Sequence, residues 1–198
     1  MWRRATGFIR LLQTPDQGRS NSAFGSPLHS ALGLSPEEIF CDRRILGNRC
    51  ESACGVTVAA NALVDTGALL ALLDRSDHWH RACVESFEQL RLPLMTSEAV
   101  LTELFHLVGD SIHEVEAAWR LVRSGAIALA TIEQSELPAI HALMLRYSDR
   151  PMDFADATLV YLAKREKLTT MFTVDHADFD TYRIEGRRRF RVIPASQP

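Results

Sequence analysis

The sequence predicts an α/β fold with a largely parallel β-sheet. From about residue 56 onward, short apolar segments rich in β-formers alternate with segments whose apolar residues recur at helical spacing. Two of the apolar segments end in an aspartate at the point where the chain enters its next element. No run reaches about 18 apolar residues, so the sequence predicts no membrane span. There is also no internal repeat, and a single α/β domain therefore explains this part of the chain.

The first strand and helix are predicted from residues 56–65 and 66–74. The run VTVAANALVD is apolar and β-rich, as a strand buried on both faces would be. Leucines at helical spacing follow in TGALLALLD, and HWHRACVESFEQL continues with a second helix at 78–90. His78 and His80 flank Trp79 there, and because residues two apart face different sides of a helix, we interpret this pair as packing rather than metal binding.

The remaining elements follow the same alternation. A strand at 92–96 leads into the helix 97–109, which we expect Ser97 to cap and Gly109 to end. The later helices are predicted at 112–122, 135–146 and 151–167, the last with Pro151 at its start, and the later strands at 126–132, 169–175 and 190–193.

Residues 1–55 differ from the rest of the chain. Gly, Ser, Asn, Pro and Arg are scattered through them without a period of 2 or 3.6. We expect a poorly ordered N-terminal extension, which would be an artefact if the start codon has been placed too far upstream. A partner-binding arm is the functional alternative. The domain proper is then residues 56–198.

The composition is that of an ordinary globular protein. Of 198 residues, 46% are hydrophobic and 24% are charged, and a chain of this length can bury a core without disulfides. Its four cysteines are not arranged at zinc-site spacing, so we interpret them as free thiols of a cytoplasmic protein. The net charge of −3 excludes a protein that coats nucleic acid with positive charge. Any binding of nucleic acid must therefore be local.

Asp65 and Asp175 come directly after two apolar strands. In parallel sheets, sites form beyond the carboxyl ends of the strands, so these two side chains are expected at one edge of the sheet. Capping the next helix is the alternative role for each of them alone. Glu103 lies at the edge of the buried side of its helix, where a carboxylate is costly unless it is paired or bound to metal.

A further pair of acids, Asp153 and Asp156, lies three residues apart near the start of the helix predicted at 151–167. Surface acids that favour the helix dipole are the simple interpretation of such a pair. The helix is apolar throughout, however, and Asp156 sits among its apolar residues and needs a partner. If these carboxylates converge, they repel one another, and a hard cation such as Mg²⁺ or Mn²⁺ relieves that repulsion. Such a site can activate a water molecule against a phosphodiester.

With these residues in hand, the sequence resembles the PIN-domain nucleases, in particular the VapC-like toxins of bacterial toxin–antitoxin pairs. The resemblance runs from about Asn61 to Pro194. Four elements carry it in order: NALVDTGALLALLDRSDHWH, TSEAVLTEL, PMDFADATLVYLA and FTVDHADFDTYR.

The resemblance implies a PIN-like three-layer α/β/α fold and a metal-dependent ribonuclease site. Asp65, Glu103 and Asp156 match the metal-binding acids of the family, and Asp175 matches its fourth acid. Asp153 is an additional candidate ligand, and Thr173 matches the hydroxyl residue that organises the last acid. The family implies Mg²⁺, with Mn²⁺ as a substitute, an RNA substrate, a homodimer, an antitoxin partner and a cytoplasmic location without membrane attachment.

Other functions remain open from the sequence. A PIN-like module that grips RNA or a protein without cutting is the main alternative. A phosphatase-type hydrolase with Asp65 as nucleophile is weaker, because Gly67 stands where such sites carry a second acid. The arginine run at 187–191 is a solvated edge by default and an RNA phosphate contact as its rival interpretation.

Overall fold

The computed structural model describes residues 60–149 and 152–195 of the chain. The predicted extension 1–55 lies outside the described residues, as do the first four residues of the predicted domain. The domain boundary therefore stays a prediction.

A five-stranded sheet forms the centre of the described domain, and every strand pair in it is parallel. Its order is β3-β2-β1-β4-β5. The strands are β1 (Leu63–Val64), β2 (Leu94–Ser97), β3 (Ile127–Ala130), β4 (Thr170–Phe172) and β5 (Arg191–Ile193). The predicted α/β fold with a parallel sheet is confirmed. Because β1 is central, the acid that follows it lies in the middle of the carboxyl edge of the sheet.

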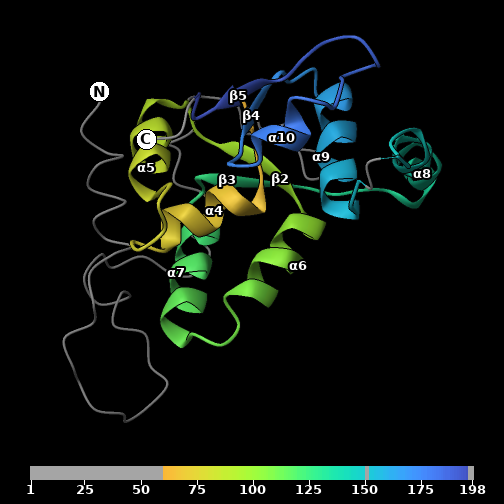
Figure 1. Ribbon diagram of the computed structural model, residues 1–198. Coiled ribbons are helices and arrows are strands. Elements are labelled where there is room, and N and C mark those ends of the chain that lie inside the picture. The colour runs from red at the N-terminus through yellow and green to blue at the C-terminus, as the bar shows by residue number, and fades with distance from the viewer. Residues whose placement is uncertain (1–59, 150–151, 196–198) are drawn as a thin grey trace, which may run out of the picture. The chain divides into compact units, whose positions relative to one another are not determined.

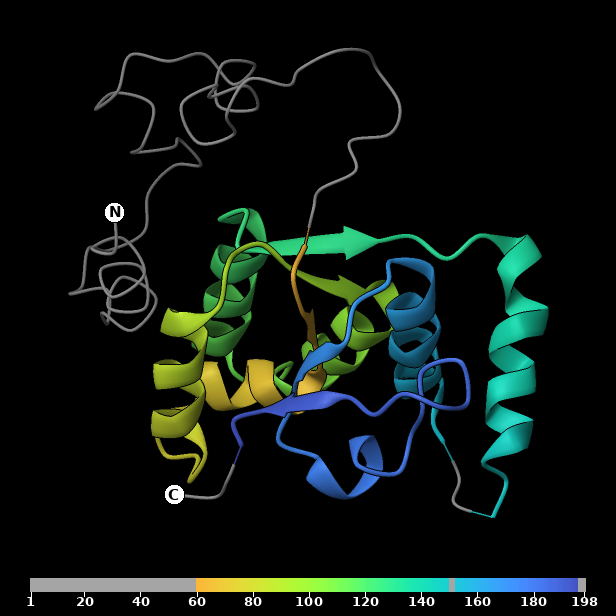
Figure 2. The ribbon, with the colours of Figure 1, turned by 90° about the horizontal axis from the view of Figure 1, so that it is seen from above.

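Helices flank the sheet on both sides, with α5 and α7 on one side and α8 and α9 on the other (Figures 1 and 2). The helices are α4 (Thr66–Leu73), α5 (His80–Gln89), α6 (Glu98–Leu107), α7 (Ile112–Arg123), α8 (Leu137–Arg146), α9 (Phe154–Arg165) and α10 (His176–Phe179), and a 3₁₀ turn, η1 (Gln134–Glu136), precedes α8. This is the layered arrangement that the sequence predicts. No helix within the described ranges is long and apolar enough to cross a membrane.

The core lies between the sheet and these helices, and it explains the apolar runs of the sequence. Both residues of β1 are fully buried, and so are Phe172 of β4 and Leu159 and Leu162 of α9. The prediction that α9 is a buried helix is therefore confirmed. Cys83 of α5 is a buried free thiol, and burial raises its pKa to about 12, so it behaves as a small apolar residue.

Three local details differ from the sequence prediction. The helix predicted from Pro151 begins at Phe154, and Asp153 is its N-cap rather than a residue of its first turn. The helix predicted at 135–146 is divided into η1 and α8. The short helix α10, after β4, was not predicted at all, because its four residues are too few to show a helical period.

Candidate active site

Asp65, at the carboxyl end of β1, is held by hydrogen bonds on both of its oxygens. Oδ1 accepts from the backbone N–H of Thr66 at 2.7 Å, which makes Asp65 the N-cap of α4. Oδ2 accepts from the Thr173 hydroxyl at 2.8 Å. The residue is only 8% exposed. Capping and a place in a buried site are thus compatible roles for this carboxylate.

Thr173 joins the ends of the two central strands. Its hydroxyl donates to Asp65 and accepts from the backbone N–H of Asp175 at 2.9 Å. The Asp175 side chain is exposed and accepts from the N–H of Asp178 at 3.0 Å, so it also caps α10. The two strand-ending acids therefore lie at one edge of the sheet, and one buried hydroxyl connects them.

Glu103 reaches the same edge from α6. Its Oε2 accepts from the Thr66 hydroxyl at 2.7 Å, and the side chain is half-buried. Thr66 follows Asp65 directly, so its backbone N–H and its hydroxyl hold two different acids. This residue had no role in the sequence prediction.

Asp156 approaches from the first turn of α9. Its Oδ2 accepts from the hydroxyl of Tyr182 at 3.1 Å, and Tyr182 itself is fully buried. Asp153 is exposed, and its Oδ1 accepts from the N–H of Asp156 at 2.7 Å. The simple interpretation of Asp153 as a helix-start acid is correct, and its charge lies next to Asp156.

The pKa values of the two buried acids show that the carboxylates lie within electrostatic reach of one another. Burial raises the pKa of Asp65 to about 6, opposed by its bonds to Thr173 and Thr66, while the charges of Glu103 and Asp153 raise it further.

Burial also raises the pKa of Asp156, to about 8, and the charges of Asp65, Asp153 and Asp178 add to this. Only the bond from Tyr182 acts in the opposite direction. The structure therefore brings the acids of β1, α6 and α9 into one electrostatic group.

The chemistry of this group fits a hard divalent cation. Every candidate ligand is a carboxylate oxygen, and Mg²⁺ in proteins is usually bound by one or two carboxylates together with several waters. Across residues 60–149 and 152–195, no three His, Cys, Asp or Glu side chains are already arranged to hold a metal ion by themselves. At least one carboxylate oxygen of each of Asp65, Glu103 and Asp156 accepts a hydrogen bond from a protein donor.

Sequence reasoning missed Thr66 and Tyr182 as neighbours of the acids. Thr66 could have been found from its position directly after Asp65 at a predicted helix start. Tyr182 carries no such signal, because its partner Asp156 lies 26 residues earlier in another element. Asp178 lies in α10 and adds negative charge near Asp156.

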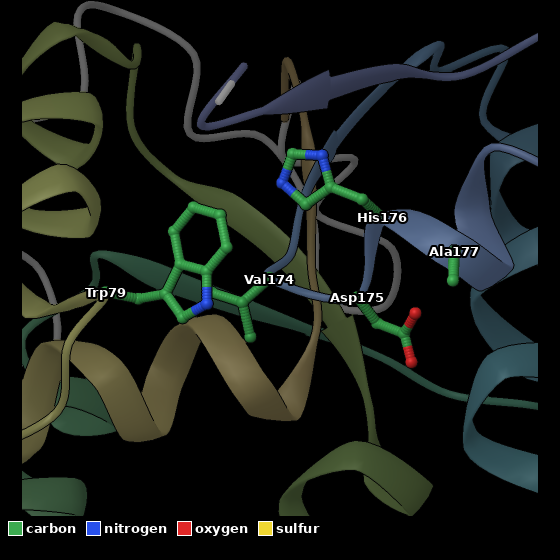
Figure 3. Close-up of a pocket in the computed structure, with 5 residues that line it drawn as sticks. All are labelled: Trp79, Val174, Asp175, His176 and Ala177. Carbon is green, nitrogen blue, oxygen red and sulfur yellow. The ribbon is translucent and has the colours of Figure 1, made fainter. Parts of the chain in front are cut away.

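A second feature beside Asp175 is a pocket of about 550 Å³. It is lined by Trp79, Val174, Asp175, His176 and Ala177 (Figure 3). The rings of Trp79 and His176 stack with centroids 5.3 Å apart and an angle of 15°. Figure 3 shows the Asp175 carboxylate pointing away from these rings. Trp79 is buried, as expected for a helix start that this residue packs, whereas His78 beside it is exposed.

Gly67 fixes the distance between α4 and the end of β4. A Cβ atom at this position would lie 2.7 Å from Val174 Cγ2 and 3.8 Å from Asp65 Oδ2. Such a contact is closer than two carbon atoms can approach. A side chain at this position would therefore force a shift of Val174, and Gly67 lets the first turn of α4 pack against the segment that leads to Asp175 without one.

Comparison with known proteins places this geometry in a family. The PIN domain family model matches residues 62–185. Ribonuclease VapC26 of Mycobacterium tuberculosis (strain ATCC 25618 / H37Rv) is 33% identical over 135 residues, which are 67% of this chain and 99% of that protein. The crystal structure of Mycobacterium tuberculosis VapC20, described as a sarcin-ricin loop cleaving toxin, matches with a TM-score of 0.52 and 19% identity over 58% of this chain and 89% of that one. The chain belongs to the PIN-domain family and is similar in sequence to a VapC ribonuclease.

Proposed function

We propose that this protein is a ribonuclease that hydrolyses RNA phosphodiester bonds with the help of Mg²⁺, for which Mn²⁺ can substitute, and that it is the toxin of a toxin–antitoxin pair. The observation that carries the proposal is the approach of two carboxylates, the buried Asp65 and the half-buried Asp156. The charge of Asp65 raises the pKa of Asp156, and the charge of Asp153 raises the pKa of both. Such an arrangement is costly for the folded protein unless a cation or protons compensate it. The similarity to a protein named as a ribonuclease supports the reaction class.

The acids have distinct proposed roles. Asp65 and Asp156 would hold the cation, Glu103 and Asp175 would complete its surroundings, and Asp153 would bind the cation or one of its waters. When bound, Mg²⁺ would lower the pKa of a water molecule and neutralise charge on the phosphate. Thr173 and Tyr182 orient the carboxylates of Asp65 and Asp156 through their hydroxyls, so that the acids are positioned before substrate arrives.

The partners follow from the same proposal. The substrate is RNA, an antitoxin would silence the enzyme, and two copies of the chain would form a homodimer. The site of action is the cytoplasm, where such a substrate is found. We expect production of the wild-type chain in bacterial cells to arrest growth, and production of the Asp156→Asn variant to be tolerated.

The central experiment measures RNA cleavage by the full chain with Mg²⁺ and with EDTA. Asp65→Asn and Asp156→Asn should each lower cleavage by at least about 100-fold, since a catalytic carboxylate is lost while its shape is kept. Asp110→Asn, an exposed acid after α6, is the matched control and should cleave like the wild type. For Glu103→Gln the control is Glu98→Gln, an exposed acid of the same helix. Cleavage that survives both Asp65→Asn and Asp156→Asn, or that is unchanged in EDTA, would overturn the proposal.

A second candidate is a PIN-like module that binds RNA without cutting it. The observation that favours it is that the described acids do not form a ready arrangement of three or more metal-holding side chains. Calorimetry separates the two functions. Mg²⁺ binding that Asp156→Asn abolishes, together with cleavage, supports the nuclease, whereas RNA binding without Mg²⁺ binding or cleavage supports the silent module.

A further inference from the structure

The segment between α10 and β5 concentrates positive charge next to the acidic group. We call residues 183–191 the arginine loop, because they include Arg183, Arg187, Arg188, Arg189 and Arg191. The loop contains a tight turn in which the N–H of Ile184 donates to the carbonyl of Arg188 at 2.9 Å. Glu185 and Gly186, at its tip, have φ angles of 53° and 73°. The three arginines that follow the tip, at 187–189, are exposed.

Two arginines of this loop are already used within the protein. The guanidinium of Arg183 donates to the backbone carbonyls of Asp180, Thr181 and Tyr182, so it holds the chain that enters the loop. Arg188 forms an ion pair with Glu185 at 3.1 Å. Arg187 and Arg189 are exposed, and neither forms an ion pair with another residue of 60–149 or 152–195.

A third exposed arginine joins them from a distant part of the sequence. Arg146 is the last residue of α8, and its Nη1 atom would lie 3.1 Å from a Cβ atom on Gly186. The guanidinium of Arg146 therefore rests against the tip of the arginine loop. A side chain at position 186 would displace it, and glycine also suits the positive φ there.

Aromatic contacts fix this basic surface beside Asp156. The Tyr147 hydroxyl, next to Arg146, accepts from the N–H of Arg183 at 3.0 Å. Its ring meets that of Tyr182 edge-on, with centroids 5.1 Å apart, and Tyr182 donates to Asp156. The basic and acidic groups are therefore held close together by one short series of contacts.

We propose that Arg146, Arg187 and Arg189 form a phosphate-binding surface that holds the RNA backbone on one side of the bond to be cut. The inference rests on the proposed function and adds where the RNA chain runs. RNA is a polyanion, and the group of acids repels it, so a protein with a net charge of −3 needs local cations beside its site. Arginine suits this purpose because its planar guanidinium binds phosphate oxygens in pairs.

The test measures binding of a fluorescein-labelled, single-stranded oligoribonucleotide of mixed sequence to the full chain by fluorescence anisotropy. Titrations are made without divalent ions, so that no cleavage is expected, and over a range of salt concentrations. The triple variant Arg146→Gln, Arg187→Gln, Arg189→Gln is compared with Arg91→Gln, Arg120→Gln, Arg123→Gln, which removes the same charge from exposed positions on α7 and before β2. Circular dichroism and the melting temperature establish that both variants fold.

We expect RNA binding by the first triple variant to depend less steeply on salt than binding by the wild type, and binding by the control variant to keep the wild-type dependence. For a single strand, three lost phosphate contacts reduce the slope of log affinity against log salt by about two. Between about 50 and 200 mM salt, the affinity of the wild type should therefore fall about 20-fold more than the affinity of the first triple variant. If the two triple variants show the same slope of log affinity against log salt, the inference is overturned. This holds even if the arginines prove to bind an acidic partner protein instead of RNA. If the triple variant does not fold, the double variant Arg187→Gln, Arg189→Gln, confined to exposed loop positions, must lower the slope by about 1.4. A wild type that binds with this slope but never cleaves would refute the proposed function alone.

Discussion

Asp65 and Asp156 lie in one electrostatic group, but the protein holds them in different ways. Asp65 is capped from both sides, with a backbone N–H on one oxygen and the Thr173 hydroxyl on the other, and its pKa is raised to about 6. Asp156 receives a single donor, Tyr182, and its pKa is raised to about 8. Asp65 is the more buried of the two, yet its pKa is raised less. Hydrogen bonds and neighbouring charges, and not burial alone, therefore decide how much of the charge the fold tolerates.

The largest expected effect is on the stability of the metal-free protein. The unfolded chain releases the Asp156 proton near its usual pKa of 3.8, whereas the folded protein keeps it until about pH 8. The folded state therefore binds more protons between these values, and stability falls as pH rises through this window. Asp156→Asn should raise the free energy of unfolding by roughly 2–4 kcal/mol at pH 8 in EDTA and change it little near pH 4. Urea denaturation at both pH values measures this.

The two acids can be separated by where the fall in stability ends. In Asp156→Asn, the remaining decline belongs to Asp65 and should end near pH 6. In Asp65→Asn the decline should continue past pH 6 but end below pH 8, because the charge of Asp65 no longer raises the pKa of Asp156. Asp110→Asn should follow the wild-type curve. Identical curves for the two variants would show that the acids are not held differently.

Removing the Thr173 hydroxyl should have the next largest effect. Thr173→Val keeps the shape of a fully buried side chain but leaves Asp65 without one donor and the N–H of Asp175 without its acceptor. We expect a loss of about 2–3 kcal/mol in the free energy of unfolding, because buried polar groups lose their partners.

Thr173→Ser, which keeps the hydroxyl, should recover most of that stability. Thr102→Val removes an exposed hydroxyl that donates to the Glu98 carbonyl and should cost at most about 0.5 kcal/mol. Equal losses in Thr173→Val and Thr102→Val would contradict the role given to the buried hydroxyl.

Tyr182→Phe should have a smaller effect on stability, because it removes only the hydroxyl that donates to Asp156 and leaves the ring contacts in place. We expect a loss of about 1 kcal/mol in urea denaturation of the metal-free protein. The matched control is Tyr161→Phe, which removes a hydroxyl that donates to Glu136 away from the site. For Tyr182→Phe alone, the concentration of Mg²⁺ needed for half-maximal cleavage should also change. An unchanged Mg²⁺ requirement would leave Tyr182 with a packing role only.

The smallest expected effect concerns Asp153, which is both the cap of α9 and a source of repulsion. Asp153→Ala should lower the free energy of unfolding by about 0.5–1 kcal/mol, because the N–H of Asp156 loses its acceptor. Asp153→Asn keeps an acceptor and removes the charge, so its stability should equal or exceed that of the wild type. Thermal denaturation in EDTA compares the two, and a less stable Asn variant would show that the charge itself stabilises the helix start.

The fold was predictable from the sequence wherever an element was long enough to show its period. The helix α9 and the runs around β1 and β4 are apolar because they are buried, and the burial pattern agrees. The start of α9 was placed too early, because Pro151 suggested a first helical position whereas Asp153 provides the cap. The helix α10 could not be predicted, because its four residues are too few to show a helical period.

The acids were predictable for two different reasons. Asp65 and Asp175 follow from the strand ends, since parallel strands share one carboxyl edge. Glu103 and Asp156 became candidates because a carboxylate in an apolar helix needs a partner. The donors Thr66 and Tyr182 were not predictable as such, because hydrogen bonds between elements 26 or more residues apart depend on the tertiary packing.

The close approach at Gly67 has a consequence for the chemistry that this junction can support. Hydrolases that form a phosphorylated aspartate commonly carry a second acid two residues after the first, and position 67 is that place. Here Val174 fills the space that the Cβ of such an acid would need. To gain it, the Val174 side chain would have to shift, and Val174 lies between Thr173, which holds Asp65, and Asp175. One methyl group of a valine thus opposes a second acid at position 67.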